Sequence, residues 1–183
     1  MNLDYFDGYV EKVEGYTFDL NLLCNEYKEV IEPNLFQPVN NHYQEVKCIW
    51  ENKTFDILNR CIETQKAIEV VSKFFVFNTV VWRQLNSQRA YHWHMDECKL
   101  NYHIPVYTNA GCWFVYPNKS FHLSADGSIY KVNNHRYHTF VNAGYKPRVH
   151  LIFENHGTDI IKERMTQITK DFFIKKKHDT NKN

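Results

Sequence analysis

Two histidines and an aspartate have the side-chain types and the order along the chain that a metal ion requires. His94-Met95-Asp96 places an imidazole and a carboxylate two positions apart, so on an extended chain both point to the same side. A single His-x-Asp often arises by chance, but His138 follows well downstream and can approach from another strand. Two histidines and one carboxylate leave coordination positions open, as in non-haem Fe(II) oxygenases, whereas a structural zinc site would be closed and richer in cysteine. We therefore predict that His94, Asp96 and His138 bind Fe(II).

Arg148 begins an alternating run that ends at Phe153, ten positions after His138. Val149, Leu151 and Phe153 would form the apolar face of this strand. If that face packs outward against helices, Arg148 points into the interior, where a guanidinium is costly unless it meets an anion. A dicarboxylate such as 2-oxoglutarate offers that anion with matching bidentate geometry. The opposite orientation, with Arg148 at the surface, fits the spacing equally well.

His103 lies on the polar side of a second alternating run, from Leu100 to Val106. A lone histidine on a strand is usually a structural residue with its hydrogen bonds satisfied. Asn101 shares its face, however, so His103 and Asn101 are candidates for the lining of a binding pocket.

Helices are expected before strands, because the apolar pattern changes its period near Phe75. Apolar spacing predicts amphipathic helices over 18–31 and about 55–74, with an irregular connection over 33–52 between them. Short strands are predicted over 75–82, 100–106, 112–116, 128–132 and 148–154. Asn109-Ala110-Gly111 and Ala125-Asp126-Gly127 are turn signals of the kind that joins antiparallel strands. The pattern predicts a mainly β protein, a sandwich or jelly roll, with flanking helices against one face.

The length and composition are those of one globular domain over 1–183. We expect a helical part over 1–74, a β core over 75–154, and a C-terminal helix with a polar tail over 155–183. A net charge of +1 argues against nucleic acid as the main partner, and no apolar stretch approaches the ~18 residues of a membrane span. The N-terminus does not resemble a signal peptide. Five cysteines without a CxxC predict reduced thiols in a cytoplasmic protein.

Taken together, the segment from Trp82 to Glu154 resembles the aspartyl/asparaginyl β-hydroxylase family of 2-oxoglutarate-dependent oxygenases, which includes bacterial hydroxylases of free proline. The order, spacing and type of several motifs agree at once, which makes the likeness more specific than any single motif. The matching motifs are His94-Met95-Asp96, Lys99-Leu100-Asn101-Tyr102-His103-Ile104-Pro105-Val106, Gly127 with the strand after it, His138-Thr139-Phe140-Val141-Asn142 and Arg148-Val149-His150-Leu151-Ile152-Phe153.

The resemblance implies a double-stranded β-helix core, which is a jelly-roll, cupin-like fold. It assigns His94 and His138 to iron, and Asp96 as well in members that keep the carboxylate. Arg148 would bind the distal carboxylate of 2-oxoglutarate, and His103 would lie near the end of this cosubstrate closest to the metal. In the family, Fe(II), 2-oxoglutarate and O2 hydroxylate an unactivated C–H bond and release succinate and CO2.

The sequence departs from the family pattern at two places. Many members carry an arginine where this chain has Asn101, so one cationic contact to the cosubstrate is missing; Arg83 or Arg89 could compensate. The usual turn containing glycine before the metal-binding strand is replaced by Asn86-Ser87-Gln88-Arg89.

A different metal-binding class also fits part of this region. His92-Trp93-His94 followed by Glu97 resembles the start of a cupin motif, in which His-x-His and a glutamate share the ion. The glutamate comes one residue too early, and the flanking glycines are absent. Such a protein would be a metal-dependent isomerase or dioxygenase that works without 2-oxoglutarate.

The substrate is left open by the sequence. A free amino acid such as proline, and an Asp, Asn or Pro side chain within a protein, are both compatible with the family. The chain has no repeat domain that would present a polypeptide, which favours a small substrate. In a non-catalytic jelly roll, exposed aromatic residues such as Trp50 or Trp113 would bind a sugar or a protein instead.

Overall fold

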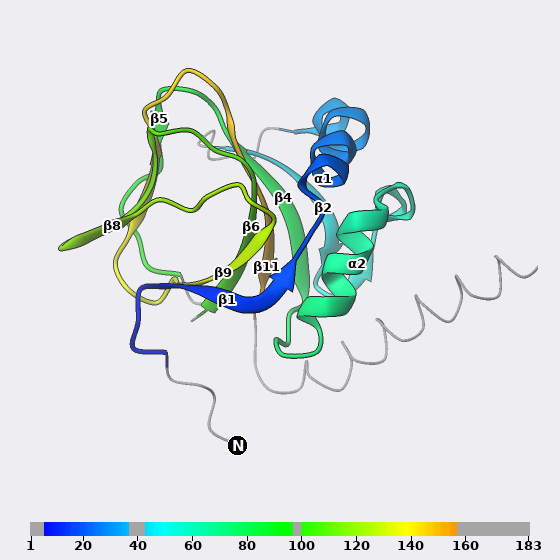
Figure 1. Cartoon of the computed structure of the whole chain (residues 1–183), viewed down its shortest axis with the longest axis horizontal. Helices are drawn as coiled ribbons and strands as arrows, with labels where there is room; N and C mark the ends of the chain where they lie inside the picture. The colour runs from blue at the N-terminus through cyan, green and yellow to red at the C-terminus, as the bar shows by residue number, and fades with distance from the viewer. Residues whose placement is uncertain (1–5, 37–42, 97–99, 157–183) are drawn as a thin grey trace, which may run out of the picture.

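A computed structural model describes residues 6–36, 43–96 and 100–156 of the chain. In these ranges two antiparallel sheets face each other, and two helices lie beside the larger sheet (Figure 1). The larger sheet has seven strands in the order β1 (Val10–Thr17), β9 (Ser128–Asn133), β6 (Leu100–Tyr107), β11 (Arg148–Glu154), β4 (Thr79–Leu85), β2 (Gln44–Trp50) and β3 (Lys53–Thr54). The smaller sheet has four, in the order β5 (Arg89–Ala90), β10 (Thr139–Asn142), β7 (Cys112–Tyr116) and β8 (Lys119–Phe121). The predicted jelly-roll class is confirmed.

The larger sheet separates an apolar layer from a polar interior. Side chains that alternate along β11 and β6 belong to the main core cluster, which also contains residues of the helices. The intervening residues of β11 and β6 lie on the opposite face of the sheet, and they include Arg148 and His103. The predicted alternation is therefore confirmed on both strands, and it orients the polar side chains toward the smaller sheet. The core members from the two strands are Val149, Leu151, Phe153, Tyr102, Ile104 and Val106.

The two helical predictions are confirmed with different bounds. The first region contains α1 (Leu20–Glu26), a π-helical turn over Tyr27–Ile31 and a short 3-10 turn over Glu32–Asn34. The carboxylate of Asp19 accepts hydrogen bonds from the first free backbone N–H groups of α1, which is the usual function of an N-terminal cap. The second region contains a 3-10 turn over Asp56–Arg60 and then α2 (Ile62–Val71).

The buried carboxylate of Glu26 joins the two helices. Its oxygens accept hydrogen bonds from the backbone N–H of Glu63, from the backbone N–H of Thr64 at 3.1 Å and from the Thr64 hydroxyl at 2.7 Å. Glu63 in turn accepts from the backbone N–H of Asp19 at 2.9 Å. Each helix thus supplies a carboxylate to the N-terminal end of the other, which holds the pair at a defined position on the sheet.

The expectation of a helical N-terminal part is only partly correct. The connection predicted as irregular over 33–52 contains β2, and β1 and β3 also lie within the first 74 residues. A bulge between Lys47 and Ile49 interrupts the alternation of β2, and β1 is an edge strand with mostly exposed residues. Neither strand therefore shows the regular period that reveals a half-buried strand in a sequence.

Both predicted turns connect the two sheets instead of closing hairpins. Asn109-Ala110-Gly111 leads from β6 to β7, and Ala125-Asp126-Gly127 leads from β8 to β9. Gly127 has φ +79°, and a Cβ there would lie 2.3 Å from the carbonyl oxygen of Phe18, so this turn requires glycine. Crossing from sheet to sheet at each turn is what closes the jelly roll around its interior.

Two of the predicted strands can be compared with the structure by their bounds. The strand predicted over 75–82 begins later, at Thr79, while the strand over 112–116 has the predicted bounds. The C-terminal helix, about 158–173, and the tail that follows it lie outside the described residues. No disulfide joins the four cysteines that the structure describes. No helix in the described ranges is long and apolar enough to cross a bilayer.

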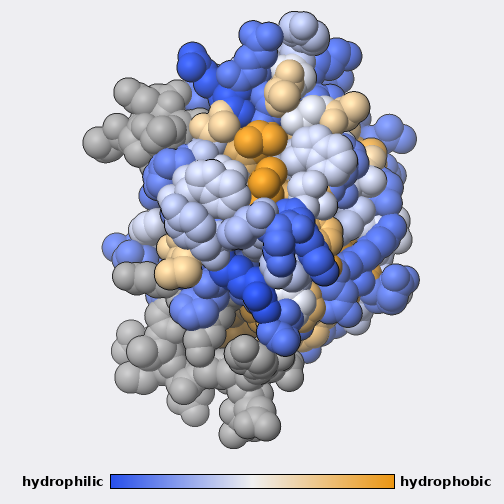
Figure 2. Space-filling model, turned by 90° about the vertical axis from the view of Figure 1, so that its left-hand side faces the viewer, coloured by the Kyte–Doolittle hydropathy of each residue, from blue (hydrophilic) through white to orange (hydrophobic). Residues whose placement is uncertain are grey.

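Figure 2 shows a mainly hydrophilic outer face on the side of the smaller sheet, with a small hydrophobic area near its middle.

Candidate active site

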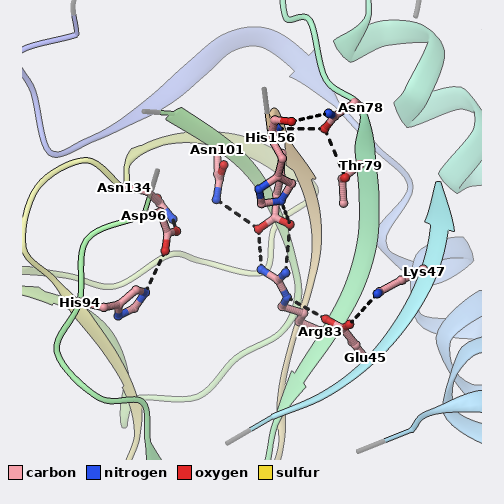
Figure 3. Close-up of polar contacts among 11 residues, drawn as sticks. Glu45, Lys47, Asn78, Thr79, Arg83, His94, Asp96, Asn101, Asn134 and His156 are labelled. Atoms are coloured by element: carbon pink, nitrogen blue, oxygen red, sulfur yellow. Dashed lines mark hydrogen bonds and ion pairs between the residues drawn. The ribbon is translucent and has the colours of Figure 1, made fainter. Parts of the chain in front are cut away.

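The three residues predicted to bind a metal lie together. His94 and His138 form an isolated antiparallel bridge, with backbone N–H to carbonyl hydrogen bonds of 2.9 and 2.8 Å. One possible ligand atom from each of His94, Asp96 and His138 lies within 4.8 Å of the other two. Nε2 of His94 is 3.2 Å from Oδ1 of Asp96 (Figure 3). The backbone bridge thus places two imidazoles and a carboxylate at one end of the polar interior.

Hydrogen bonds on the far side of each imidazole prepare it as a ligand. Nδ1 of His94 lies 2.9 Å from the carbonyl oxygen of His92, and Nδ1 of His138 lies 2.8 Å from that of Arg136. A carbonyl oxygen only accepts, so in the neutral rings Nδ1 carries the proton and Nε2 keeps a lone pair. Nε2 of His138 is buried and has no hydrogen-bond partner among the described residues.

The charge states also suit a metal. Burial lowers the pKa of His138, which keeps this ring neutral. Burial alone would raise the pKa of Asp96, but the contact with His94 and the hydrogen bond from Asn134 bring the pKa down to about 2, so the carboxylate remains ionised. Burial alone would lower the pKa of His94, but the same contact raises it, and a bound metal ion would take the place of the proton on Nε2 of this ring. A neutral imidazole and an ionised carboxylate are the forms that bind metal ions, and this set of two nitrogens and one oxygen fits Fe(II).

Sequence reasoning did not identify Asn134, which holds the carboxylate of the site. Its side-chain Nδ2 donates to Oδ2 of Asp96 at 2.6 Å, and its carbonyl oxygen accepts from the backbone N–H of Asp96 at 2.9 Å. Asn134 follows β9 directly, and nothing in its sequence surroundings distinguishes it from the neighbouring Asn133.

A pocket of about 370 Å³ lies beside the three residues and extends along the inner face of the larger sheet. His94 and Asp96 line it, and so do all three residues predicted to contact a cosubstrate, Arg148, His103 and Asn101. The remaining lining residues are Tyr43, Arg83, Gln84, Leu85, Tyr91, Met95, Phe114, Asn134, Phe140, Ile152, Glu154 and His156.

The guanidinium of Arg148 faces this interior, so the inward orientation of β11 is the correct one. Arg148 is only 4% exposed, and no carboxylate among the described residues forms an ion pair with it. Its guanidinium carbon lies 5.3 and 5.1 Å from the ring centroids of Phe114 and Phe140. Burial lowers the pKa of Arg148 to about 10, which still leaves the group protonated at neutral pH. A buried cation without an anion indicates that a ligand supplies the negative charge.

Asn101 and Arg83 belong to a polar network at the other end of β11 (Figure 3). Arg83 donates to both carboxylate oxygens of Glu154 at 2.5 and 3.0 Å and to Glu45 at 3.2 Å, and Asn101 donates to Glu154 at 3.3 Å. Burial alone would raise the pKa of Glu154, but the ion pair with Arg83 and the contact with His156 bring it down to about 2.

The idea that Arg83 or Arg89 replaces the missing family arginine is not supported. The guanidinium of Arg83 is held by Glu154 and Glu45, while Arg89 is exposed and does not line the pocket. The turn without glycine before the metal-binding segment is formed with Gln88 at φ +55°, a conformation that glycine would adopt with less strain.

The cupin-like arrangement is not formed by the described residues. His92 is exposed, its ring stacks on Tyr91 with centroids 4.2 Å apart, and it does not belong to the cluster of metal-binding atoms. Glu97 lies outside the described residues. The second imidazole comes instead from His138 on the facing segment.

Comparison with solved structures supports the fold. The chain is similar to an oxidoreductase of the 2OG-Fe(II) oxygenase family from Burkholderia pseudomallei, with a TM-score of 0.56 and 11% identity over 79% of this chain and 84% of that one. It is also similar to a prolyl-4-hydroxylase from Pseudomonas putida, with a TM-score of 0.54 and 10% identity over 81% of this chain and 93% of that one.

Sequence comparison identifies the family. No curated protein matches the sequence at a significant level. The aspartyl/asparaginyl β-hydroxylase family profile matches residues 20–156, a range that contains both helices, the three clustered ligands and the buried Arg148. The chain therefore belongs to the aspartyl/asparaginyl β-hydroxylase family.

Proposed function

We propose that this protein is a hydroxylase that uses Fe(II), 2-oxoglutarate and O2 to hydroxylate an unactivated C–H bond of an amino acid, free or within a protein. The observation that carries the proposal is the buried guanidinium of Arg148, which has no anionic partner among the described residues and lies in the same pocket as His94 and Asp96. A cation placed there calls for an anionic ligand beside the metal site, and membership of the family makes 2-oxoglutarate the best candidate.

His94, Asp96 and His138 are the residues that would hold the iron. When bound, Fe(II) supplies the activation of O2, coupled to oxidative decarboxylation of 2-oxoglutarate to succinate and CO2. The chain's own contribution is to keep both Nε2 lone pairs and the Asp96 carboxylate available on one side of the site.

Arg148 would bind the distal carboxylate of the cosubstrate through paired N–H donors. The rings of Phe114 and Phe140 lie against its guanidinium and exclude water from this end of the pocket, which strengthens a contact between opposite charges. His103 lies on the neighbouring strand and lines the same pocket. Asn101 donates to Glu154, so we place it at the boundary between cosubstrate and substrate.

For the substrate, we propose an amino acid or an Asp, Asn or Pro side chain. The end of the pocket near Glu154 is lined by charged and aromatic groups, including Arg83, Tyr43 and His156. Such a surface suits a small polar substrate better than an aliphatic one.

The test is an anaerobic titration of the full chain with Fe(II) and 2-oxoglutarate. We expect a weak visible charge-transfer band that requires both, and its absence at saturating concentrations would exclude the proposed site. Succinate release is then measured with each of the twenty amino acids and with peptides that contain Asp, Asn or Pro. Stimulation by one of these compounds identifies the substrate class. The same titration is carried out with Arg148→Met, which removes the proposed anion-binding cation. Arg136→Met is its matched control, because the guanidinium of Arg136 pairs with Asp7 outside the pocket.

A further inference from the structure

One ring nitrogen, Nδ1 of His150, has two polar neighbours that belong to the pocket wall. The guanidinium NH2 nitrogen of Arg148 lies 3.1 Å from it, and Nδ1 of His103 lies 3.2 Å from it. His150 itself is 1% exposed and does not line the pocket, whereas Arg148 and His103 do. His150 therefore contacts two candidate ligand-binding residues without reaching the ligand.

The chemistry of the three groups determines where their protons lie. A protonated guanidinium has only donors, so Nδ1 of His150 accepts a hydrogen bond from Arg148. The same nitrogen then carries no proton, and Nδ1 of His103 must be the donor in the contact between the two rings. In a neutral imidazole only one nitrogen is protonated, so Nε2 of His103 keeps a lone pair.

Burial supports the neutral state of both rings. Burial, followed by the charge of Arg148, lowers the pKa of His150 far below its usual value and that of His103 to about 3. Neither ring is therefore an imidazolium at neutral pH, and the assignment of one proton to each ring holds.

We propose that His150 is a positioning residue whose Nδ1 accepts hydrogen bonds from both Arg148 and His103, aligns the cosubstrate-binding guanidinium, and fixes His103 in the tautomer protonated at Nδ1. Its role in cosubstrate binding rests on the proposed function, whereas the hydrogen bonds do not. His103 then offers an acceptor to the group next to it, because its buried Nε2 has no partner among the described residues.

The first test measures the tautomer in the unmodified, metal-free full chain. Nitrogen-15 NMR of labelled histidine side chains distinguishes a protonated from an unprotonated ring nitrogen, and a His103→Gln variant assigns the signals of this ring. We expect His103 to be protonated at Nδ1 and not at Nε2. A ring protonated at Nε2 would overturn the proposal whether or not the protein is active.

The second test compares two substitutions of His150. In His150→Asn, Oδ1 takes the position of Nδ1 and keeps an acceptor, whereas His150→Leu has similar volume and no acceptor. We expect His150→Leu to raise the KM for 2-oxoglutarate about tenfold, the effect of one lost hydrogen bond to a charged group, with a much smaller change in kcat. His150→Asn should remain within about threefold of the parent in KM.

His135→Leu changes an exposed histidine outside the pocket and should leave KM and the His103 signals unchanged. If His150→Leu has the parent KM, or if His150→Asn is as impaired as His150→Leu, the positioning role is wrong. If the parent releases no succinate, the proposed function fails, while the NMR result still decides whether His150 sets the tautomer.

Discussion

The side-chain amide of Asn134 lies 2.6 Å from Oδ2 of Asp96, and the backbone of the same two residues is joined by a second hydrogen bond of 2.9 Å. Two contacts between the same residues fix both the position of the Asp96 backbone and the rotation of its carboxylate. Oδ1, the oxygen beside His94, is thereby left available for a metal. A neighbouring hydrogen-bond donor that orients a metal-binding carboxylate contributes strongly to the affinity for the metal ion.

Replacing this donor should weaken metal binding more than it weakens the fold. We expect Asn134→Leu to lower the affinity for Fe(II) on the order of 10- to 100-fold, because the carboxylate loses its orienting hydrogen bond. The measurement is an anaerobic binding titration with Fe(II). Asn155→Leu is the matched control, since that amide bonds the carbonyl of Val76 and does not line the pocket; equal losses in both variants would show a general effect of folding.

Removal of a metal ligand should abolish turnover while the jelly roll remains folded. His138 is fully buried beside Phe114 and Tyr116. The sheets are nevertheless held by backbone ladders, and the backbone hydrogen bonds between His138 and His94 do not require the imidazole. We expect His138→Ala and Asp96→Ala to release no succinate and to keep the circular dichroism spectrum of the parent. His135→Ala, at an exposed position, should retain activity. An active His138→Ala protein would contradict the assignment of this ligand.

The fold was predictable wherever burial on one face produced a regular pattern. Strands β6, β7, β9 and β11 have one side in the core, and their alternation appears directly in the sequence. Edge strand β1 has too few buried residues to show such a pattern. Strand β2 combines a bulge with inward-facing Glu45, whose charge is paired by Arg83 from the next strand. Its polar residues are buried through a partner distant in sequence, which local periodicity does not reveal.

The candidate site was predictable in its reactive groups but not in the groups that hold them. His94, Asp96, His138, Arg148 and His103 were identified from residue type, spacing and family resemblance, and the structure brings their segments together. Asn134 and the hydrogen-bonding role of His150 were not, because asparagine and histidine on a strand have many structural uses. Their importance depends on distances between side chains, and those follow only from the packing of one strand against another.

Arg148 should matter more for cosubstrate binding than for stability. We expect Arg148→Met to raise the KM for 2-oxoglutarate by at least tenfold, because a charge-assisted contact is lost. Without cosubstrate, the same change should stabilise the protein by about 1 kcal/mol or more, since a buried cation without an anionic partner is replaced by an apolar side chain. Succinate assays and thermal unfolding measure the two effects.

Opposite signs for binding and stability are the signature of an anion site. Arg83→Met is the comparison, because that guanidinium is paired with two carboxylates and its loss should destabilise the fold. An Arg148→Met protein that titrates like the parent would show that this guanidinium does not contact the cosubstrate.

The ion pair between Glu154 and Arg83 should make stability depend on pH in the acid range. The pKa of Glu154 is about 2 in the folded protein, below the usual 4.5. The ionised carboxylate therefore favours folding above pH 4.5, and this contribution is lost as the pH falls from 4.5 towards 2. A difference of this size corresponds to about 3 kcal/mol.

Glu154→Gln isolates this contribution, because the variant keeps the shape of the side chain without a titrating group. We expect it to be less stable than the parent by up to about 3 kcal/mol at pH 7, and by less than half of that at pH 3, measured by urea unfolding at both values. Glu69→Gln, on the exposed side of α2, should differ little from the parent at either pH. If the difference between Glu154→Gln and the parent stays constant across this range, the carboxylate is not stabilised by Arg83, and the polar network of the pocket does not contribute to folding in the way that its distances indicate.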